Sequence, residues 1–142
     1  MAAAREDNLS EFSFTAAVRG FHIYRRVWLP HIRQRLSAER EHGNVEDRFA
    51  IAVREDGGTR ADEVRPLVGH LPREFSKVLW YFLLHGGVVE CEVTGRRQRS
   101  PLEQGGLEVP CSITLRGKKK VVAKAQELLS KLCNSLCVLY VH

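Results

Sequence analysis

The chain has 142 residues, a length that suits one domain with a single hydrophobic core. With 44% hydrophobic and 27% charged residues it has the composition of a soluble globular protein, and no apolar run is long enough to cross a bilayer. The formal charge of +5, from 22 basic and 17 acidic side chains, favours anionic partners, with nucleic acid first among them.

The start of the chain and its cysteines argue against secretion. Residues 1–10 are polar and alanine-rich and contain no apolar signal core, so we expect a flexible leader and an intracellular protein. The cysteines form no C-x-x-C pair, which favours reduced, packed thiols over a metal site. We therefore expect no metal and no cofactor. The four cysteines are Cys91, Cys111, Cys133 and Cys137.

The first third of the chain has mainly the periodicity of strands. Residues 12–18 alternate apolar and polar side chains, which predicts a strand. After Gly20, typical of a bulge or a close backbone approach, residues 21–28 continue the pattern. Residues 31–36 fit either a helical turn or an extended segment, and the charged stretch over 39–44 predicts a loop.

The clearest helix of the chain follows two further predicted strands. Residues 49–53 are a short β-prone run, and residues 64–71 fit the returning strand after a glycine turn. Pro72 suits the first position of a helix, where its missing N–H costs nothing. One apolar stripe then continues to the glycine pair at 86–87, so we predict a helix that begins at Pro72 and stops there.

The rest of the chain completes an α+β pattern. Residues 88–94 and 107–115 predict strands on either side of a polar loop over 96–106, and a second helix follows Gly117. About six short strands with two helices predict a strand-dominated α+β domain over 11–133, either a small, partly open barrel or a strongly bent sheet. The apolar tail, residues 134–142, could pair with a sheet edge, dock on the core or meet a partner.

Three polar clusters stand at the ends of predicted strands, where binding sites are commonly placed. No motif of a nucleophilic serine, a phosphate-binding loop or a zinc protease occurs, so we expect a binding module and no enzyme. Arginine can hold a phosphate, asparagine and aspartate can accept from a sugar hydroxyl, and aromatic rings can stack on bases. Each cluster also has a structural alternative, such as a solvated face or an Asx turn. The clusters are His22, Tyr24 and Arg25; Asn44 and Asp47; and His70 and Arg73.

Three of the segments occur in an order that resembles the HIRAN domain, a module of SWI/SNF-type remodellers that also stands alone. They are residues 14–20, the Asn44-x-x-Asp47-x-x-Ala50-Ile51-Ala52-Val53 pattern and Val68-Gly69-His70-Leu71-Pro72, and the resemblance covers about residues 12–132. The resemblance implies an OB-like β-barrel that binds single-stranded DNA at its 3′ end. It also implies a nuclear protein of DNA repair.

The resemblance assigns roles to particular residues. In the family, the aspartate of the N-x-x-D motif and its neighbours hold the terminal hydroxyl, which nominates Asn44 and Asp47. For contacts with the phosphate and the base, the resemblance nominates Tyr24, His70 and, by position, Arg73. Members that bind DNA carry two aromatic rings around the terminal base, where this chain has Ile23 and Glu46. Because stacking contributes roughly 1–3 kcal/mol per base, we expect weaker binding here.

Other functions remain open from the sequence. A protein-interaction domain could keep the fold and lose the DNA site, with the apolar tail at 134–142 as a partner or dimer surface. RNA or another nucleotide end is a further alternative ligand. Two basic clusters, at 96–99 and 118–120, could extend a phosphate track, whose signature is strong salt dependence, or could be solvated faces.

Overall fold

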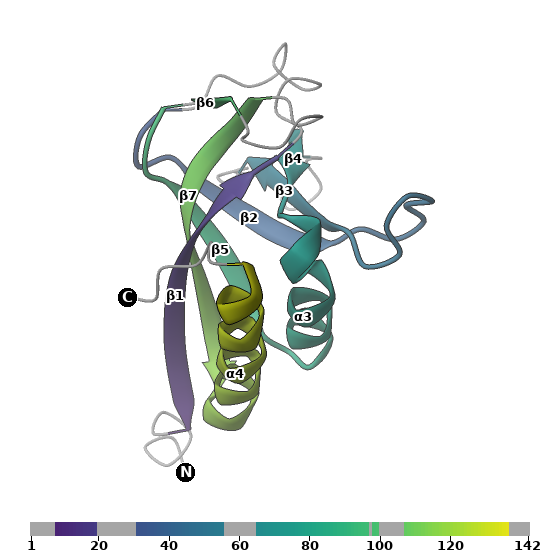
Figure 1. The fold of residues 1–142 in the computed structure, drawn as a ribbon, viewed down its shortest axis with the longest axis vertical. Helices are drawn as coiled ribbons and strands as arrows, with labels where there is room; N and C mark the ends of the chain where they lie inside the picture. Colours follow the sequence, from purple (N-terminus) through teal and green to yellow (C-terminus); the bar gives the residue numbers. More distant parts are fainter. Residues whose placement is uncertain (1–7, 20–30, 56–64, 97, 100–106, 137–142) are drawn as a thin grey trace.

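The computed structural model of the chain describes residues 8–19, 31–55, 65–96, 98–99 and 107–136. Six strands form one antiparallel sheet in the order β1-β7-β5-β2-β3-β4, and a short seventh strand, β6, pairs with β7 (Figure 1). The strands are β1 (Leu9–Val18), β2 (Arg35–Arg40), β3 (Ile51–Glu55), β4 (Leu67–His70), β5 (Val88–Val93), β6 (Gln98–Arg99) and β7 (Leu107–Lys118), and the helices are α3 (Arg73–Leu84) and α4 (Lys119–Leu136).

The longest ladder joins β1 to β7, from the Leu9–Lys118 pair to the Val18–Val109 pair. Its inward side chains alternate along β1, as the sequence pattern predicts, and Phe12 and Phe14 are buried in the core. The next strand, β5, carries Cys91 into the same core, and Cys111 on β7 is also buried, so both are packed free thiols as expected.

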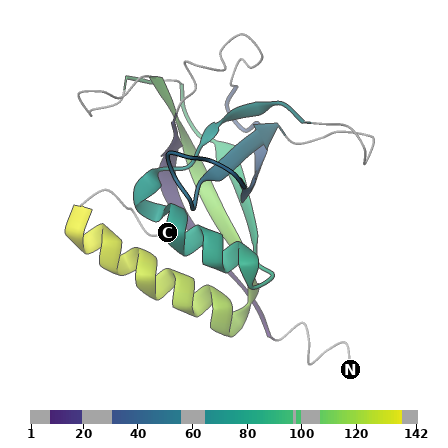
Figure 2. The ribbon, with the colours of Figure 1, turned by 90° about the vertical axis from the view of Figure 1, so that its right-hand side faces the viewer.

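Both helices lie on the same side of the sheet (Figure 2). The apolar stripe of α3 buries Phe75, Leu79 and Phe82, and α4 adds its own buried stripe to the same cluster. Pro72 is the N-cap of α3, and beyond its C-terminal end Gly86 adopts a positive φ of 88°. The helix therefore ends where the glycines predict, and it begins at Arg73, one residue after the predicted start, because Pro72 is the N-cap and not the first helical residue.

The sheet is open, so the barrel expected from the sequence is not confirmed. Among the described residues, the edge strands β1 and β4 meet only where Arg19, just after β1, pairs with His70. There the Arg19 N–H donates to the His70 carbonyl (2.8 Å) and the His70 N–H donates to the Arg19 carbonyl (2.9 Å). The strand-dominated α+β architecture with two helices is as predicted.

The strand β2 corrects the charged loop predicted over 39–44, because Glu39 and Arg40 belong to it. Only Leu36 and Ala38 of β2 face the core, and its outward side chains are polar. Across the ladder, Arg54 of β3 pairs with Glu39, so a cross-strand ion pair accommodates the charge.

Several further boundaries differ from the predictions. The strand β1 begins at Leu9, inside the leader predicted over 1–10, and β4 spans Leu67–His70 within the strand predicted over 64–71. Part of the predicted loop over 96–106 is β6, and β7 continues to Lys118, past the predicted end at 115. The helix α4 runs to Leu136 and so includes the first three residues of the tail predicted over 134–142. The strand predicted over 21–28 lies outside the described residues. No described helix has the length and apolar character that crossing a bilayer requires.

Candidate nucleic-acid interface

An open groove of about 600 Å³ lies where the end of β4, the start of α3 and the loop formed by residues 41–50 meet. This 41–50 loop joins β2 to β3 and projects beside α3 (Figure 1). Four residues nominated from the sequence line the groove, namely Asn44, Asp47, His70 and Arg73. Residues that are far apart in the chain, on a loop, a strand end and a helix start, are thus brought to one surface.

Asn44 organises the 41–50 loop. Its Oδ1 accepts the N–H groups of Glu46 (2.9 Å) and Asp47 (3.0 Å), and its Nδ2 donates to Glu41 (2.7 Å). The preceding Gly43 has a positive φ of 81°, which favours glycine. Both lone pairs of the Asn44 oxygen are therefore used within the loop, the Asx-turn alternative that the sequence left open.

Asp47 ties the loop to the start of α3. Its Oδ1 accepts the Phe49 N–H (2.9 Å), and its Oδ2 accepts the hydroxyl of the buried Ser76 (3.1 Å). The Nε of Arg73 lies 4.0 Å from Oδ2. Because an ionised carboxylate has about four acceptor positions, Asp47 retains capacity for a further donor from the groove.

His70 and Glu41 form a pair across the groove. The Nε2 of His70 lies 3.1 Å from both carboxylate oxygens of Glu41. Desolvation by burial raises the pKa of Glu41, but hydrogen bonds from Asn44 and His70, with the charges of His70 and Arg54, outweigh it and leave that pKa below its ordinary value. Glu41 is therefore an ionised partner that orients the His70 ring.

Arg19 is a groove residue that our sequence reasoning missed. Its guanidinium donates to Glu74 (2.8 Å), and its Nε lies 3.7 Å from the carboxylate of the buried Glu108. These partners are 55 and 89 positions away in sequence (74 minus 19 and 108 minus 19), so no local pattern predicts the arrangement. The sequence signal available was its position directly before Gly20.

The charge of the groove is mixed. Glu41, Glu46 and Asp47 contribute three carboxylates, whereas the arginines of the groove are Arg19 and Arg73. Arg73 is the more accessible of the two, with 65% of its side chain exposed, and it also donates to the carbonyl of Glu46. Such a surface can bind one phosphate and a hydroxyl donor, but it would repel a row of phosphates.

The fold is similar to solved HIRAN domains. It matches the crystal structure of the HIRAN domain of human HLTF with a TM-score of 0.67 and 20% identity, over 89% of this chain and 94% of that one. It also matches the NMR structure of the HLTF HIRAN domain in its DNA-bound conformation, with a TM-score of 0.62 and 20% identity, over 92% of this chain and 96% of that one. The chain has a HIRAN-like fold. No family model and no curated protein matches the sequence.

Glu46 is the position between Asn44 and Asp47 at which the sequence resemblance leads us to expect an aromatic ring. Glu46 is exposed at the rim of the groove, between Asn44 and Asp47. The other nominated residues, His22, Tyr24 and Arg25, lie outside the described residues, as does Ile23. The described part of the chain contains no group of histidine, cysteine and acidic side chains that could hold a metal ion.

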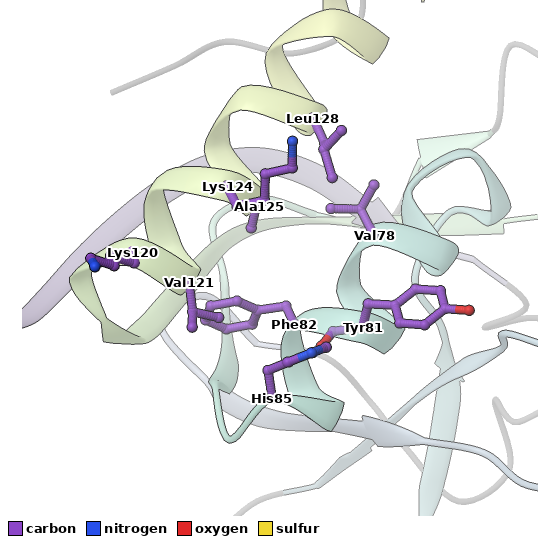
Figure 3. Close-up of a pocket in the computed structure, with 9 residues that line it drawn as sticks. All are labelled: Val78, Tyr81, Phe82, His85, Lys120, Val121, Lys124, Ala125 and Leu128. Atoms are coloured by element: carbon purple, nitrogen blue, oxygen red, sulfur yellow. The ribbon is translucent and has the colours of Figure 1, made fainter.

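A second cavity of about 250 Å³ lies between α3 and α4 of the HIRAN-like domain (Figure 3). Its walls are largely apolar, and the Tyr81 hydroxyl on α3 and the Lys120 ammonium on α4 point away from the space between the helices (Figure 3). Ligand sites normally place a few polar groups so that they converge on the ligand. The other two polar side chains of the lining have partners of their own: the Lys124 ammonium lies 3.7 Å from the Glu127 carboxylate, and the Nδ1 of His85 lies 2.7 Å from the Tyr81 carbonyl oxygen. We therefore assign the candidate site to the groove at the 41–50 loop.

Proposed function

We propose that this HIRAN-like domain binds single-stranded DNA and receives the 3′-terminal nucleotide in the groove. The observation that carries the proposal is the Asp47 carboxylate, with acceptor capacity left, beside the exposed guanidinium of Arg73. A terminal hydroxyl would donate to Asp47, and the adjacent phosphate would accept from Arg73. The HIRAN-like fold supports the same ligand class, since the HLTF HIRAN domain has a DNA-bound conformation.

The charge of the groove favours a strand end over a strand interior. A continuous strand places a phosphate on both sides of every sugar, and one of them would face Glu41, Glu46 or Asp47. A 3′ end instead offers a neutral hydroxyl that needs an acceptor. The carboxylates that oppose an internal phosphate would therefore select for the terminus.

A titration of fluorescent oligonucleotides tests this proposal. Strands of about ten nucleotides, within the range of OB-type site sizes, would carry either a 3′-hydroxyl or a 3′-phosphate and be titrated at two salt concentrations. We expect tighter binding of the hydroxyl form. The Asp47→Asn variant, which keeps an acceptor for the Phe49 N–H, should lose that preference, and Arg73→Gln should weaken both complexes.

The outcomes separate the alternatives. Equal, weak and steeply salt-dependent binding of both strands would contradict end recognition and leave only nonspecific attraction. Tighter binding of an RNA strand of the same sequence would identify RNA as the ligand. Absence of binding to every strand would favour a protein-interaction domain on this scaffold, with residues 137–142, which follow α4, as the first segment to delete.

The HIRAN resemblance also motivates a non-enzymatic role in the nucleus, in DNA repair. Imaging of the tagged full chain in cells tests the location. Exclusion from the nucleus would contradict this part of the proposal without affecting the binding measurement.

A further inference from the structure

A cluster of aromatic rings and cations lies next to the groove and takes no part in it. Arg48 and Phe49 directly follow Asp47 in the 41–50 loop, and Lys77 and Tyr81 of α3 continue the helix face on which Arg73 lies, at i+4 and i+8. Trp80 joins the two segments, because its ring packs edge-on against Phe49, with 5.9 Å between the centroids.

Three cations are held against these rings. The Arg40 guanidinium lies 5.3 Å from the centroid of the Trp80 ring. Arg48 and Lys77 both lie over Phe49, at 5.5 Å and 5.6 Å from its centroid. An aromatic face attracts a cation through its quadrupole and leaves the charge in place, whereas a carboxylate would neutralise it.

The cations of this cluster differ in that respect from those of the groove. Among the described residues, Arg40, Arg48 and Lys77 form no ion pair with a carboxylate. In the groove, by contrast, Arg19 pairs with Glu74 and Arg73 lies beside Asp47. The uncompensated positive charge beside the groove is therefore concentrated on the ring-held cations.

We propose that Arg40, Arg48 and Lys77 contact the backbone phosphates of the strand whose end lies in the groove. The inference rests on the proposed function and extends it. The strand would leave the groove past Arg73 and cross the 41–50 loop and α3, where its phosphates meet fixed cations. Tyr81, 45% exposed, offers a ring on which a base of this segment can stack.

The rival basic cluster, Lys118, Lys119 and Lys120, lies elsewhere. Gly117 packs against Gly87, just past the C-terminal end of α3, so these lysines stand at the opposite end of α3 from the groove. Lys77 lies seven residues before the end of α3 at Leu84, about 10 Å along the helix axis, and Arg40 and Arg48 lie on β2 and the 41–50 loop. We therefore treat the two basic clusters as separate surfaces. They provide matched variants, each losing three positive charges.

The test is the salt dependence of binding, measured by fluorescence anisotropy with a 3′-hydroxyl oligonucleotide of about fifteen nucleotides. On single strands each phosphate contact contributes about 0.7 to the slope of log K against log salt. The Arg40→Gln/Arg48→Gln/Lys77→Gln variant should therefore lose about 2 from the slope and keep the 3′-hydroxyl preference. The control triple, Lys118→Gln/Lys119→Gln/Lys120→Gln, should retain the slope of the unchanged protein.

The outcomes distinguish this inference from the proposed function. If the unchanged protein prefers the 3′-hydroxyl but the cluster variant keeps its slope, the inference is wrong and the groove proposal stands. An equal loss of slope in both triple variants would show that the DNA is attracted by the overall positive charge and not by this cluster, and would also overturn the inference. Absence of binding by the unchanged protein would refute both. If the triple variant gives no cooperative thermal transition, the single variant Lys77→Gln, at an exposed position, replaces it. This variant should lose about 0.7 from the slope of log K against log salt, and an unchanged slope would overturn the inference.

Discussion

Gly69, in the Val68-Gly69-His70 segment of β4, stands where the two edges of the sheet touch. A Cβ atom at this position would lie 2.5 Å from the Arg19 carbonyl oxygen and 2.6 Å from Cγ1 of Val18. Both distances are well inside van der Waals contact, and the nearer atom belongs to the backbone, which cannot rotate away. Gly69→Ala should therefore push the end of β1 away from β4.

The expected cost follows from what that movement disrupts. The two backbone hydrogen bonds between Arg19 and His70, each worth about 1 kcal/mol net, would stretch or break. Overpacking adds about 1–3 kcal/mol. Gly69 has no positive φ, so alanine would recover about 0.4–1 kcal/mol by restricting the unfolded chain. We expect a net loss of roughly 2–4 kcal/mol in the free energy of unfolding.

Urea unfolding followed by tryptophan fluorescence measures this loss, with Gly43→Ala as the control. Gly43 has open space around it and a positive φ of 81°. Gly43→Ala should therefore lower the free energy of unfolding only by the cost of a left-handed backbone for alanine, about 1–2 kcal/mol. A Gly69→Ala protein within about 0.5 kcal/mol of the unchanged one would refute the close approach of β1 and β4. A cost no larger than that of Gly43→Ala would refute the steric explanation.

Three further predictions concern single groups. Asp47→Ala should lower the free energy of unfolding by about 1–3 kcal/mol, because the Phe49 N–H loses a charged acceptor, whereas the Ser76 hydroxyl keeps the Arg73 carbonyl at 3.0 Å. Asp47→Asn should cost about half as much, and equal urea midpoints for the two variants would contradict this. The lowered pKa of Glu41 means that its contribution to stability is complete above the ordinary glutamate pKa of about 4.3 and is lost as the pH falls through the lower folded value. Glu41→Gln should therefore flatten the pH dependence of unfolding in that acidic window, and an unchanged profile would refute the His70–Glu41 pairing. Desolvation by burial raises the pKa of Cys91 well above its ordinary value and the pKa of Cys111 to about 12. Peptide mapping after alkylation at pH near 8 should therefore find both thiols unmodified until urea unfolds the domain. Rapid modification of either thiol in the folded state would contradict their burial.

The sequence by itself determined the elements whose signals are local. The stripe of α3 and its ends at Pro72 and Gly86 depend on side-chain periodicity and backbone dihedral limits, which act over a few residues. The alternation along β1 is local in the same sense. The polar residues Asn44, Asp47, His70 and Arg73 could be nominated because they lie at the ends of predicted strands or in the adjoining loops, and the structure does bring them together.

The tertiary structure decided the pairings and the electrostatics. The short, charged β2 is a strand because β3 and β5 pair with it, and Leu36 and Ala38 alone give too weak a pattern. Arg19 reaches the groove because β1 and β4 meet at one bridge, a contact between residues 51 positions apart (70 minus 19). Glu41 could not be recognised as the partner of His70, since nothing near it in sequence reports that contact. Hydrogen bonds and ion pairs between distant residues are formed only when the sheet assembles, and they set which cations stay uncompensated beside the groove.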